Sequence, residues 1–327
     1  MRCSRRSWLL KLATLGVLAG LPISAAFAQT DYPNRPLRII VGFAPGGSND
    51  IVARLLAEKL NKSFGQPAIV ENKPGGGGAL AAAFVKSQPA DGYTLLVGAS
   101  GAMVVGPAIG APASYETLAD FEPVSTLVTF PLVFIVNAES PHKTLKDLVA
   151  WSKANPSASN YGSASPTFTL AAELLKLRTG ASMQRVSYRG SNDAVVAVLG
   201  NQVTAAMTDP LPAIPLLKDG KLRALAVTSP NRLAELPDVP TMAEAGIMGA
   251  EAVFWTGLFL PKGTPREVVS RLEAEVRTAM QDPEIRQRLR SLATEAVSSS
   301  PAEFAGRITN DLKAWNDVAK AAKVTVE

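Results

Sequence analysis

Residues 37–50 read LRIIVGFAPGGSND, which is an apolar run, then a glycine turn, then a segment with a helical pattern. The apolar run is rich in Val, Ile and Leu and does not alternate with polar residues, as is typical of a strand buried on both faces. Comparable runs at 68–71 and 94–98 are separated by helical patterns at 49–64 and 79–87. This β-α-β-α-β order predicts a parallel sheet with right-handed crossovers.

The same alternation returns in the middle of the chain and predicts a second sheet. Its strands are expected at 160–162, 185–188, 203–207 and 222–228, and its helices at 145–154, 170–178 and 193–199. A tail of helices is expected at 265–280, 283–292 and 301–323.

Two stretches interrupt the alternation, and we interpret both as crossings between two lobes. The extended run 121–137 is longer than the usual strand of about 3 to 10 residues. The proline-rich segment 237–261 ends in an aromatic strand and provides the return. We therefore expect residues 29–128 to begin lobe 1, 129–230 to form lobe 2, and 231–327 to complete lobe 1. A ligand cleft is expected between the lobes, at the carboxyl ends of the strands.

The N-terminus has the pattern of an export signal. Basic residues precede an apolar run at 12–23, and Ala26-Phe27-Ala28 forms a cleavage site, so residues 1–28 are expected to be removed after Ala28 in the periplasm. The run is broken by Pro22 and is shorter than the roughly 20 apolar residues of a membrane span. The pair Arg5-Arg6 leaves both the general secretory route and the twin-arginine route open.

The net charge and the amino-acid composition argue against several classes of function. Without the signal the chain has 29 basic and 28 acidic residues and no basic run, which argues against nucleic acid as a partner. The only cysteine, Cys3, lies in the signal, so the remaining chain has no thiol for a disulfide or a nucleophile. The single histidine, His142, reads as part of a surface loop, which argues against a His-based triad. No cofactor or metal is expected, and a site with several histidines is impossible.

Two glycine loops follow the first two strands and predict an anion site. The first holds Gly47 and Ser48, and the second, at 71–78, reads ENKPGGGG. Glycine lets the backbone approach a ligand, and the first N–H groups of a helix lack internal partners and attract a carboxylate. The second loop lacks the Gly-Lys-Ser or Gly-Lys-Thr of a P-loop, and neither loop has the dinucleotide fingerprint.

Each of these polar residues also has a purely structural interpretation. Ser48 is equally read as the N-cap of its helix. Asp50 would repel an anion, so we interpret it mainly as a cap of its own helix, and otherwise as a contact to a cationic part of the ligand or to a water. Two polar residues further along the chain, Tyr188 and Asp209, can also be read either as site residues or as structural ones. The structural interpretation makes Tyr188 a core aromatic residue and Asp209, which precedes Pro210, a turn residue.

At this point the chain resembles a known family, the Bordetella-uptake-gene or tripartite tricarboxylate transporter substrate-binding receptors. The resemblance covers nearly all of the chain after the signal. It lies in fragments whose order and spacing together are specific: Tyr32-Pro33, Pro45-Gly46-Gly47, Glu71-Asn72-Lys73-Pro74-Gly75, Asp91-Gly92-Tyr93, Tyr161-Gly162-Ser163, Tyr188-Arg189-Gly190, Pro237-Asp238-Val239-Pro240-Thr241 and Trp255-Thr256-Gly257.

The resemblance implies a two-lobed α/β fold of the type II periplasmic binding protein class. It places the ligand carboxylate between the two glycine loops, partly through water, while the second lobe reads the rest of the ligand. The implied ligand contacts are Gly47, Ser48, Asp50, Gly77, Gly78 and Ser100 from lobe 1, and Ser163, Ser165, Thr167, Tyr188 and Asp209 from lobe 2.

The stretch 163–169 departs from the family pattern. Similar receptors have a longer, glycine-rich loop there, with a histidine where this chain has Thr169, and Pro166 restricts the backbone. The second-lobe contacts and the identity of the ligand are therefore left open.

The leading hypothesis is a monomeric periplasmic receptor that delivers a small carboxylate ligand to the membrane permease of a tripartite transporter. Two alternatives remain: the same fold serving as a ligand sensor for a two-component system, and a hydrolase that uses Ser48 or Asp50 in the same cleft.

Overall fold

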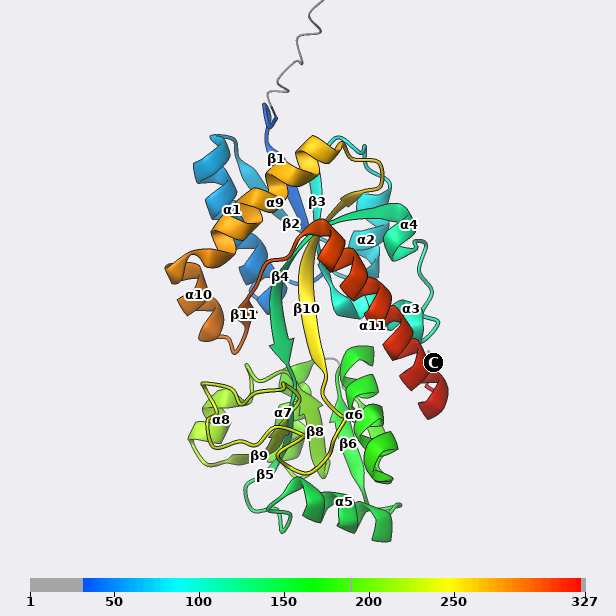
Figure 1. Cartoon of the computed structure of the whole chain (residues 1–327). Coiled ribbons are helices and arrows are strands. Elements are labelled where there is room, and N and C mark those ends of the chain that lie inside the picture. Colours follow the sequence, from blue (N-terminus) through cyan, green and yellow to red (C-terminus); the bar gives the residue numbers. More distant parts are fainter. Residues whose placement is uncertain (1–31, 189, 325–327) are drawn as a thin grey trace, which may run out of the picture. The chain divides into compact units, whose positions relative to one another are not determined.

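Two β-sheets with flanking helices organise the chain (Figure 1). The computed structural model describes residues 32–188 and 190–324, and Tyr32 onward forms one compact unit. The expected export signal, its cleavage site and Cys3 lie outside the described residues. Within the described part, no helix is both long and apolar enough to span a membrane.

The first sheet and its helices make up what we call lobe 1. The strand order is β11-β4-β10-β3-β1-β2. Its strands are β1 Leu37–Val41, β2 Ala68–Asn72, β3 Thr94–Ala99, β4 Phe121–Pro131, β10 Val253–Pro261 and β11 Glu295–Ala296. Its helices are α1 Ser48–Phe64, α2 Ala79–Lys86, α3 Gly106–Ala108, α4 Thr117–Asp120, α9 Arg266–Gln281, α10 Pro283–Arg290 and α11 Pro301–Ala322.

The second sheet and its helices make up lobe 2, with the strand order β7-β6-β8-β5-β9. Its strands are β5 Val133–Asn137, β6 Asn160–Ser163, β7 Gln184–Ser187, β8 Ala205–Thr208 and β9 Leu222–Val227. Its helices are α5 Leu145–Ala154, α6 Pro166–Thr179, α7 Ser191–Leu199 and α8 Ile214–Lys218. Both sheets follow one plan, in which three parallel strands are followed by a strand that arrives antiparallel from the other sheet.

The long extended segment is a crossing, as expected. It divides at Leu132 into β4, which belongs to the first sheet, and β5, which belongs to the second. The return strand β10 pairs antiparallel with β4, from Val253 opposite Pro131 to Pro261 opposite Phe121 (Figure 1). The lobe boundaries at 128/129 and 230/231 stay predictions.

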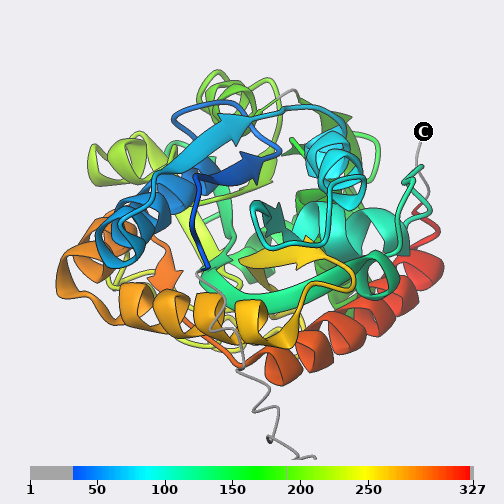
Figure 2. The same cartoon turned by 90° about the horizontal axis from the view of Figure 1, so that it is seen from above.

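Burial on both faces explains why β1 has no polar alternation. Leu37, Ile39 and Val41 pack in one apolar cluster with α1 and α9, whereas Ile40 packs in a second cluster on the other face. Helices α9 and α11 both contact β4 (Figure 2). Near β10 the packing is so tight that a Cβ added at Gly257 would lie 2.1 Å from Cζ of Phe304 in α11.

The expected start of one helix and the expected exposure of His142 were wrong. Helix α6 begins at Pro166 and not at Leu170, because the Ser165 hydroxyl accepts the Phe168 N–H and caps the helix, and proline fits the first helical position. His142 is not on the surface: it is 7% exposed, and its ring lies 4.8 Å from that of Trp151. Burial lowers the pKa of the His142 imidazole, with Asp147 acting in the opposite direction.

Candidate functional site

The carboxyl ends of β1, β2 and β3 meet at one edge of the first sheet, because these strands are parallel neighbours. The end of β1 and the second glycine loop come into backbone contact there. A Cβ added at Gly42 would lie 2.5 Å from Cα of Gly78, so only glycine fits at position 42 without a shift. The sequence interpretation missed Gly42, although a glycine directly after a buried strand is a signal of close backbone approach.

The second glycine loop has a backbone that only glycine adopts readily. Gly75, Gly76, Gly77 and Gly78 all have positive φ angles, of 144°, 57°, 62° and 105°. Residues Gly76–Gly78 form a 3₁₀ turn, and α2 follows it directly. A Cβ added at Gly77 would meet no atom within 4 Å, so this glycine borders open space, as a ligand contact requires.

The first glycine loop leads into α1, but its cap differs from the expected one. Gly47 is the N-cap, and Ser48 is the first residue of the helix, so the interpretation of Ser48 as the N-cap is wrong. Gly47 is exposed and Ser48 is half-buried. The N–H groups of the first turn of α1 therefore start beside the loop, where an anion would accept their hydrogen bonds.

Asp50 joins the two glycine loops. One carboxylate oxygen, Oδ2, accepts hydrogen bonds from the Gly46 N–H at 2.9 Å and from Arg54 Nε at 2.8 Å. The other, Oδ1, accepts one from Asn72 Nδ2 at 2.9 Å, and Asn72 is the last residue of β2 and part of the second loop. Burial raises the pKa of the Asp50 carboxyl, but the hydrogen bonds from Arg54, Gly46 and Asn72 outweigh burial and hold this pKa below its usual value. That Asp50 contacts the ligand stays a prediction, whereas its hydrogen bonds to both glycine loops are present in the structure.

Ser100 directly follows β3, the third of the parallel strands of lobe 1. Its side chain is 1% exposed, and its Oγ accepts the backbone N–H of Trp255 at 3.2 Å. This bond ties the end of β3 to β10. Ser100 is followed by a π-helical turn, Gly101–Val105, a rare element that is frequent at functional sites.

The second-lobe hydroxyl groups form a cluster at the start of α6. Ser163 Oγ donates to the Ser165 carbonyl oxygen at 3.1 Å and lies 2.8 Å from Thr169 Oγ1. Ser163 and Thr167 are both buried. The structure therefore brings Ser163, Ser165 and Thr167 together, with Ser163 and Ser165 already bonded within the protein.

Tyr188 and Asp209 follow β7 and β8, whose carboxyl ends lie at the same edge of the second sheet as that of β6. The Tyr188 ring is half-buried and packs over Gly162, where an added Cβ would lie 3.2 Å from Cε2. The Ser191 hydroxyl donates a hydrogen bond to Asp209 Oδ2. Burial raises the pKa of the Asp209 carboxyl, and the bond from Ser191 acts in the opposite direction.

The two lobes adjoin where these residues lie. A Cβ added at Gly101, just after β3 of lobe 1, would lie 2.9 Å from Oγ1 of Thr167 in α6 of lobe 2. The predicted first-lobe and second-lobe contacts thus belong to two strand-end edges that come together at Gly101 and Thr167.

The candidate contacts in this region are hydrogen-bonding groups. In the described part of the chain no group of three His, Cys, Asp or Glu side chains is placed to hold a metal ion. What the strand ends offer is backbone N–H groups on glycine loops, hydroxyl groups, the buried carboxyl of Asp50 and the half-buried carboxyl of Asp209. Two α/β lobes that present such groups at their strand ends are those of a solute receptor of the periplasmic binding protein class.

Comparison with known proteins identifies the family. The family model described as "Tripartite tricarboxylate transporter family receptor" matches residues 52–324. The protein BugT of Bordetella pertussis is 35% identical over 313 residues, 94% of this chain and 96% of its own. The chain belongs to this family of tripartite tricarboxylate transporter receptors, whose members are substrate-binding receptors and not an enzyme family.

Two solved structures with bound acids are similar throughout. The Rhodopseudomonas palustris protein Rpa4515, solved with adipate, has a TM-score of 0.82 at 31% identity and covers 90% of this chain and 99% of its own. MatC from the same species, solved with bound malate, has a TM-score of 0.77 at 32% identity, over 88% of this chain and 99% of its own. Both support the two-lobed fold.

Proposed function

We propose that this receptor binds a small carboxylic acid, with one carboxylate held by the first-lobe glycine loops, and delivers it to the permease subunits of a tripartite transporter. The observation that carries the proposal is the four-glycine loop after β2, whose backbone lies against the end of β1 and borders open space at Gly77. Solved relatives contain adipate and malate, both of which have a carboxylate at each end.

The complete set of predicted contacts enters this proposal in two groups. Gly47, Ser48, Gly77 and Gly78 contact the carboxylate, Asp50 braces the two loops, and Ser100 fixes the end of β3 to β10. Ser163, Ser165, Thr167, Tyr188 and Asp209 face the remainder of the ligand. Ser163 and Ser100 contribute mainly through their neighbours, because both hydroxyl groups are buried and bonded to protein atoms.

A thermal-shift screen tests the carboxylate site. Adipate and malate should raise the melting temperature increasingly with concentration, because a ligand that binds only the folded state stabilises it by mass action. The corresponding diamides should not. Equal stabilisation by acid and amide would contradict the anion site.

A pair of glycine variants locates the site. Gly77→Val should abolish stabilisation by every acid, because the side chain enters the open space and the backbone has φ +62°. Gly65→Val is the matched control: Gly65 has φ +65° and open space around it, but it caps the opposite end of α1. Loss of acid binding in both variants would show strain and not a ligand site.

We further propose that the protein acts in the periplasm as a monomer, without catalysis. The family supports the receptor role, and the absence of a second histidine in the sequence argues against a His-based enzyme. A sensor role predicts copurification with a histidine kinase instead of a permease, so a pull-down from membranes distinguishes the two.

A further inference from the structure

The two crossings between the lobes meet at one buried threonine. Thr228 follows β9 directly and is fully buried. Its hydroxyl oxygen accepts the Leu132 N–H at 2.7 Å, and its own N–H donates to the Leu132 carbonyl oxygen at 2.9 Å. Leu132 is the residue between β4 and β5, so these bonds fasten β9 to the first crossing.

The same threonine holds the return crossing. The Thr228 hydroxyl donates to the Ala252 carbonyl oxygen at 2.6 Å, and the Ala252 N–H donates to the Thr228 carbonyl oxygen at 2.9 Å. Ala252 directly precedes β10. One hydroxyl group thus accepts from one crossing and donates to the other, which an aliphatic side chain cannot do.

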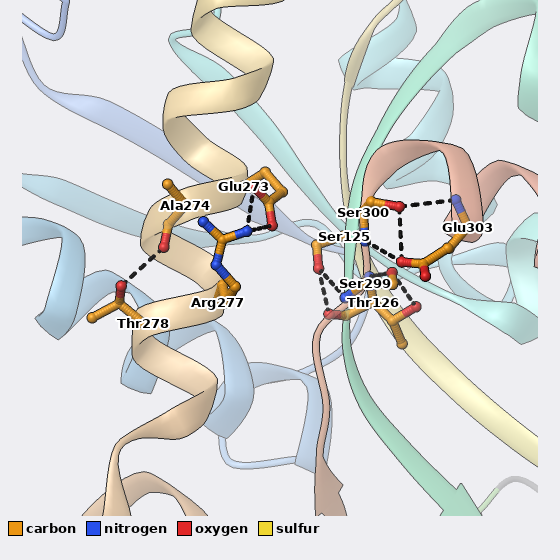
Figure 3. A network of polar contacts seen from close by, with 9 residues as sticks. All are labelled: Ser125, Thr126, Glu273, Ala274, Arg277, Thr278, Ser299, Ser300 and Glu303. Atoms are coloured by element: carbon orange, nitrogen blue, oxygen red, sulfur yellow. Dashed lines mark hydrogen bonds and ion pairs between the residues drawn. The ribbon is translucent and has the colours of Figure 1, made fainter.

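Lobe 1 holds the other end of the paired strands β4 and β10. The Ser299 hydroxyl accepts the Thr126 N–H at 3.0 Å, and the Ser299 N–H donates to Ser125 Oγ at 2.9 Å (Figure 3). Strand β11 of lobe 1 pairs with Val128 and Thr129, and the Val297 N–H donates to the Leu127 carbonyl oxygen at 3.0 Å. Lobe 1 therefore holds β4 as far as Thr129, and only Phe130 and Pro131 separate this part of β4 from Leu132.

We propose that Thr228 is the positioning residue of the hinge: its hydroxyl group, beside its backbone hydrogen bonds, makes Leu132 and Ala252 move with lobe 2 and confines bending to the paired strands β4 and β10 between Thr129 and Leu132. Hinge residues are few and absorb the backbone rotation of domain closure. The hydrogen bonds of Thr228 fix the lobe-2 end of the paired strands β4 and β10. Each closure then brings the predicted contacts of lobe 2 to the same position over the glycine loops. Only this last consequence rests on the proposed function.

Lobe separation can be measured without any ligand. Spin labels at Lys62→Cys in α1 and Ala154→Cys in α5, both exposed positions, report one residue on each lobe in a Cys3→Ser background. Thr228→Val keeps the shape and removes the hydroxyl group, and it should broaden the distance distribution. The Leu132 amide should exchange its hydrogen about ten-fold faster or more, the effect of losing one hydrogen bond. Thr228→Ser keeps the hydroxyl group and should match the parent protein.

Thr264→Val is the matched control, because Thr264 is a buried threonine whose hydroxyl donates to Pro261 at the far end of β10. Its distance distribution should stay narrow. The proposal is overturned if Thr228→Val matches the parent in both measurements, or if Thr264→Val broadens the distribution equally. If Thr228→Val does not fold, hydrogen exchange is measured on the parent protein. Fast exchange of the amide hydrogens of both Leu132 and Ala252 would then overturn the proposal. Failure of adipate and malate to bind would count against the proposed function and leave the distance result standing.

Discussion

At the scale of single residues, the carboxylate of Asp50 shows how a charge of the wrong sign is accommodated beside an anion site. Its oxygens are occupied by Gly46, Arg54 and Asn72, and its side chain is 3% exposed. A carboxylate whose lone pairs are taken and whose charge is paired repels a ligand less than a free one does. Asp50 thereby orders both glycine loops.

Asp50→Asn should weaken binding of every acid and destabilise the fold. The amide nitrogen cannot accept a hydrogen bond, so at least one of the three donors loses its partner in a buried place, which costs about 1 to 3 kcal/mol. Chemical denaturation and calorimetry with malate measure the two effects. Arg54→Gln separates the two effects: it unpairs the Asp50 charge, which should weaken malate binding, but it leaves the bonds to Gly46 and Asn72 intact, so the fold should lose less stability than in Asp50→Asn. Unchanged malate affinity in Asp50→Asn would refute the bracing role.

His142 gives the stability of the protein a dependence on pH. Because burial lowers the pKa of the folded imidazole below its ordinary 6.5, the unfolded chain takes up this proton at higher pH than the folded protein does. The contribution of the neutral His142 to the stability of the fold is complete above pH 6.5 and is lost as the pH falls from 6.5 through the folded pKa. For one proton the slope is at most about 1.4 kcal/mol per pH unit.

His142→Phe should flatten this slope, because phenylalanine keeps a ring against Trp151 and has no proton to bind. Urea unfolding at pH values from 7.5 down to 5 compares the two proteins. The difference between them isolates His142 from the carboxyl groups that titrate at lower pH. A parent protein and a variant with the same slope would show that His142 does not cause it.

At the scale of secondary structure, the elements set by local pattern were predicted closely. The expected helix 49–64 and strand 94–98 differ from α1 and β3 by one residue. The start of α6 differs from the expected one because the apolar periodicity begins only at Leu170, whereas the helix begins at Ser165-Pro166, a cap followed by a proline at the first helical position. Ser48 is a common type of N-cap residue, but Gly47 takes that position.

The site was less predictable than the elements, because its bonds join residues far apart in the chain. Asp50 and Asn72 are 22 residues apart, and Leu132 and Thr228 are 96 apart. No local spacing signals such pairs. His142 is a different case: Trp151, whose ring lies against its own, is only nine residues further on in α5, but a loop before a helix gives no sign that the two rings meet.

At the scale of the whole molecule, the two strand-end edges must approach closely without clashing. Gly101 and Thr167 mark the place where they do so, and a glycine at this position leaves room for the threonine hydroxyl. Since interiors are closely packed, even one methyl group at such a contact displaces its neighbours.

Gly101→Ala should therefore hold the lobes further apart. The added Cβ would lie 2.9 Å from Thr167 Oγ1, and that contact is too short to persist unless Thr167 or its lobe moves. The expected result is a longer mean distance between spin labels at positions 62 and 154, together with weaker binding of malate, because closure brings contacts that the open state lacks. Adding Thr167→Ala removes the opposing oxygen and should restore the shorter distance. If Gly101→Ala leaves the distance unchanged while malate binding falls, Gly101 would be a ligand contact and not the point at which the lobes meet.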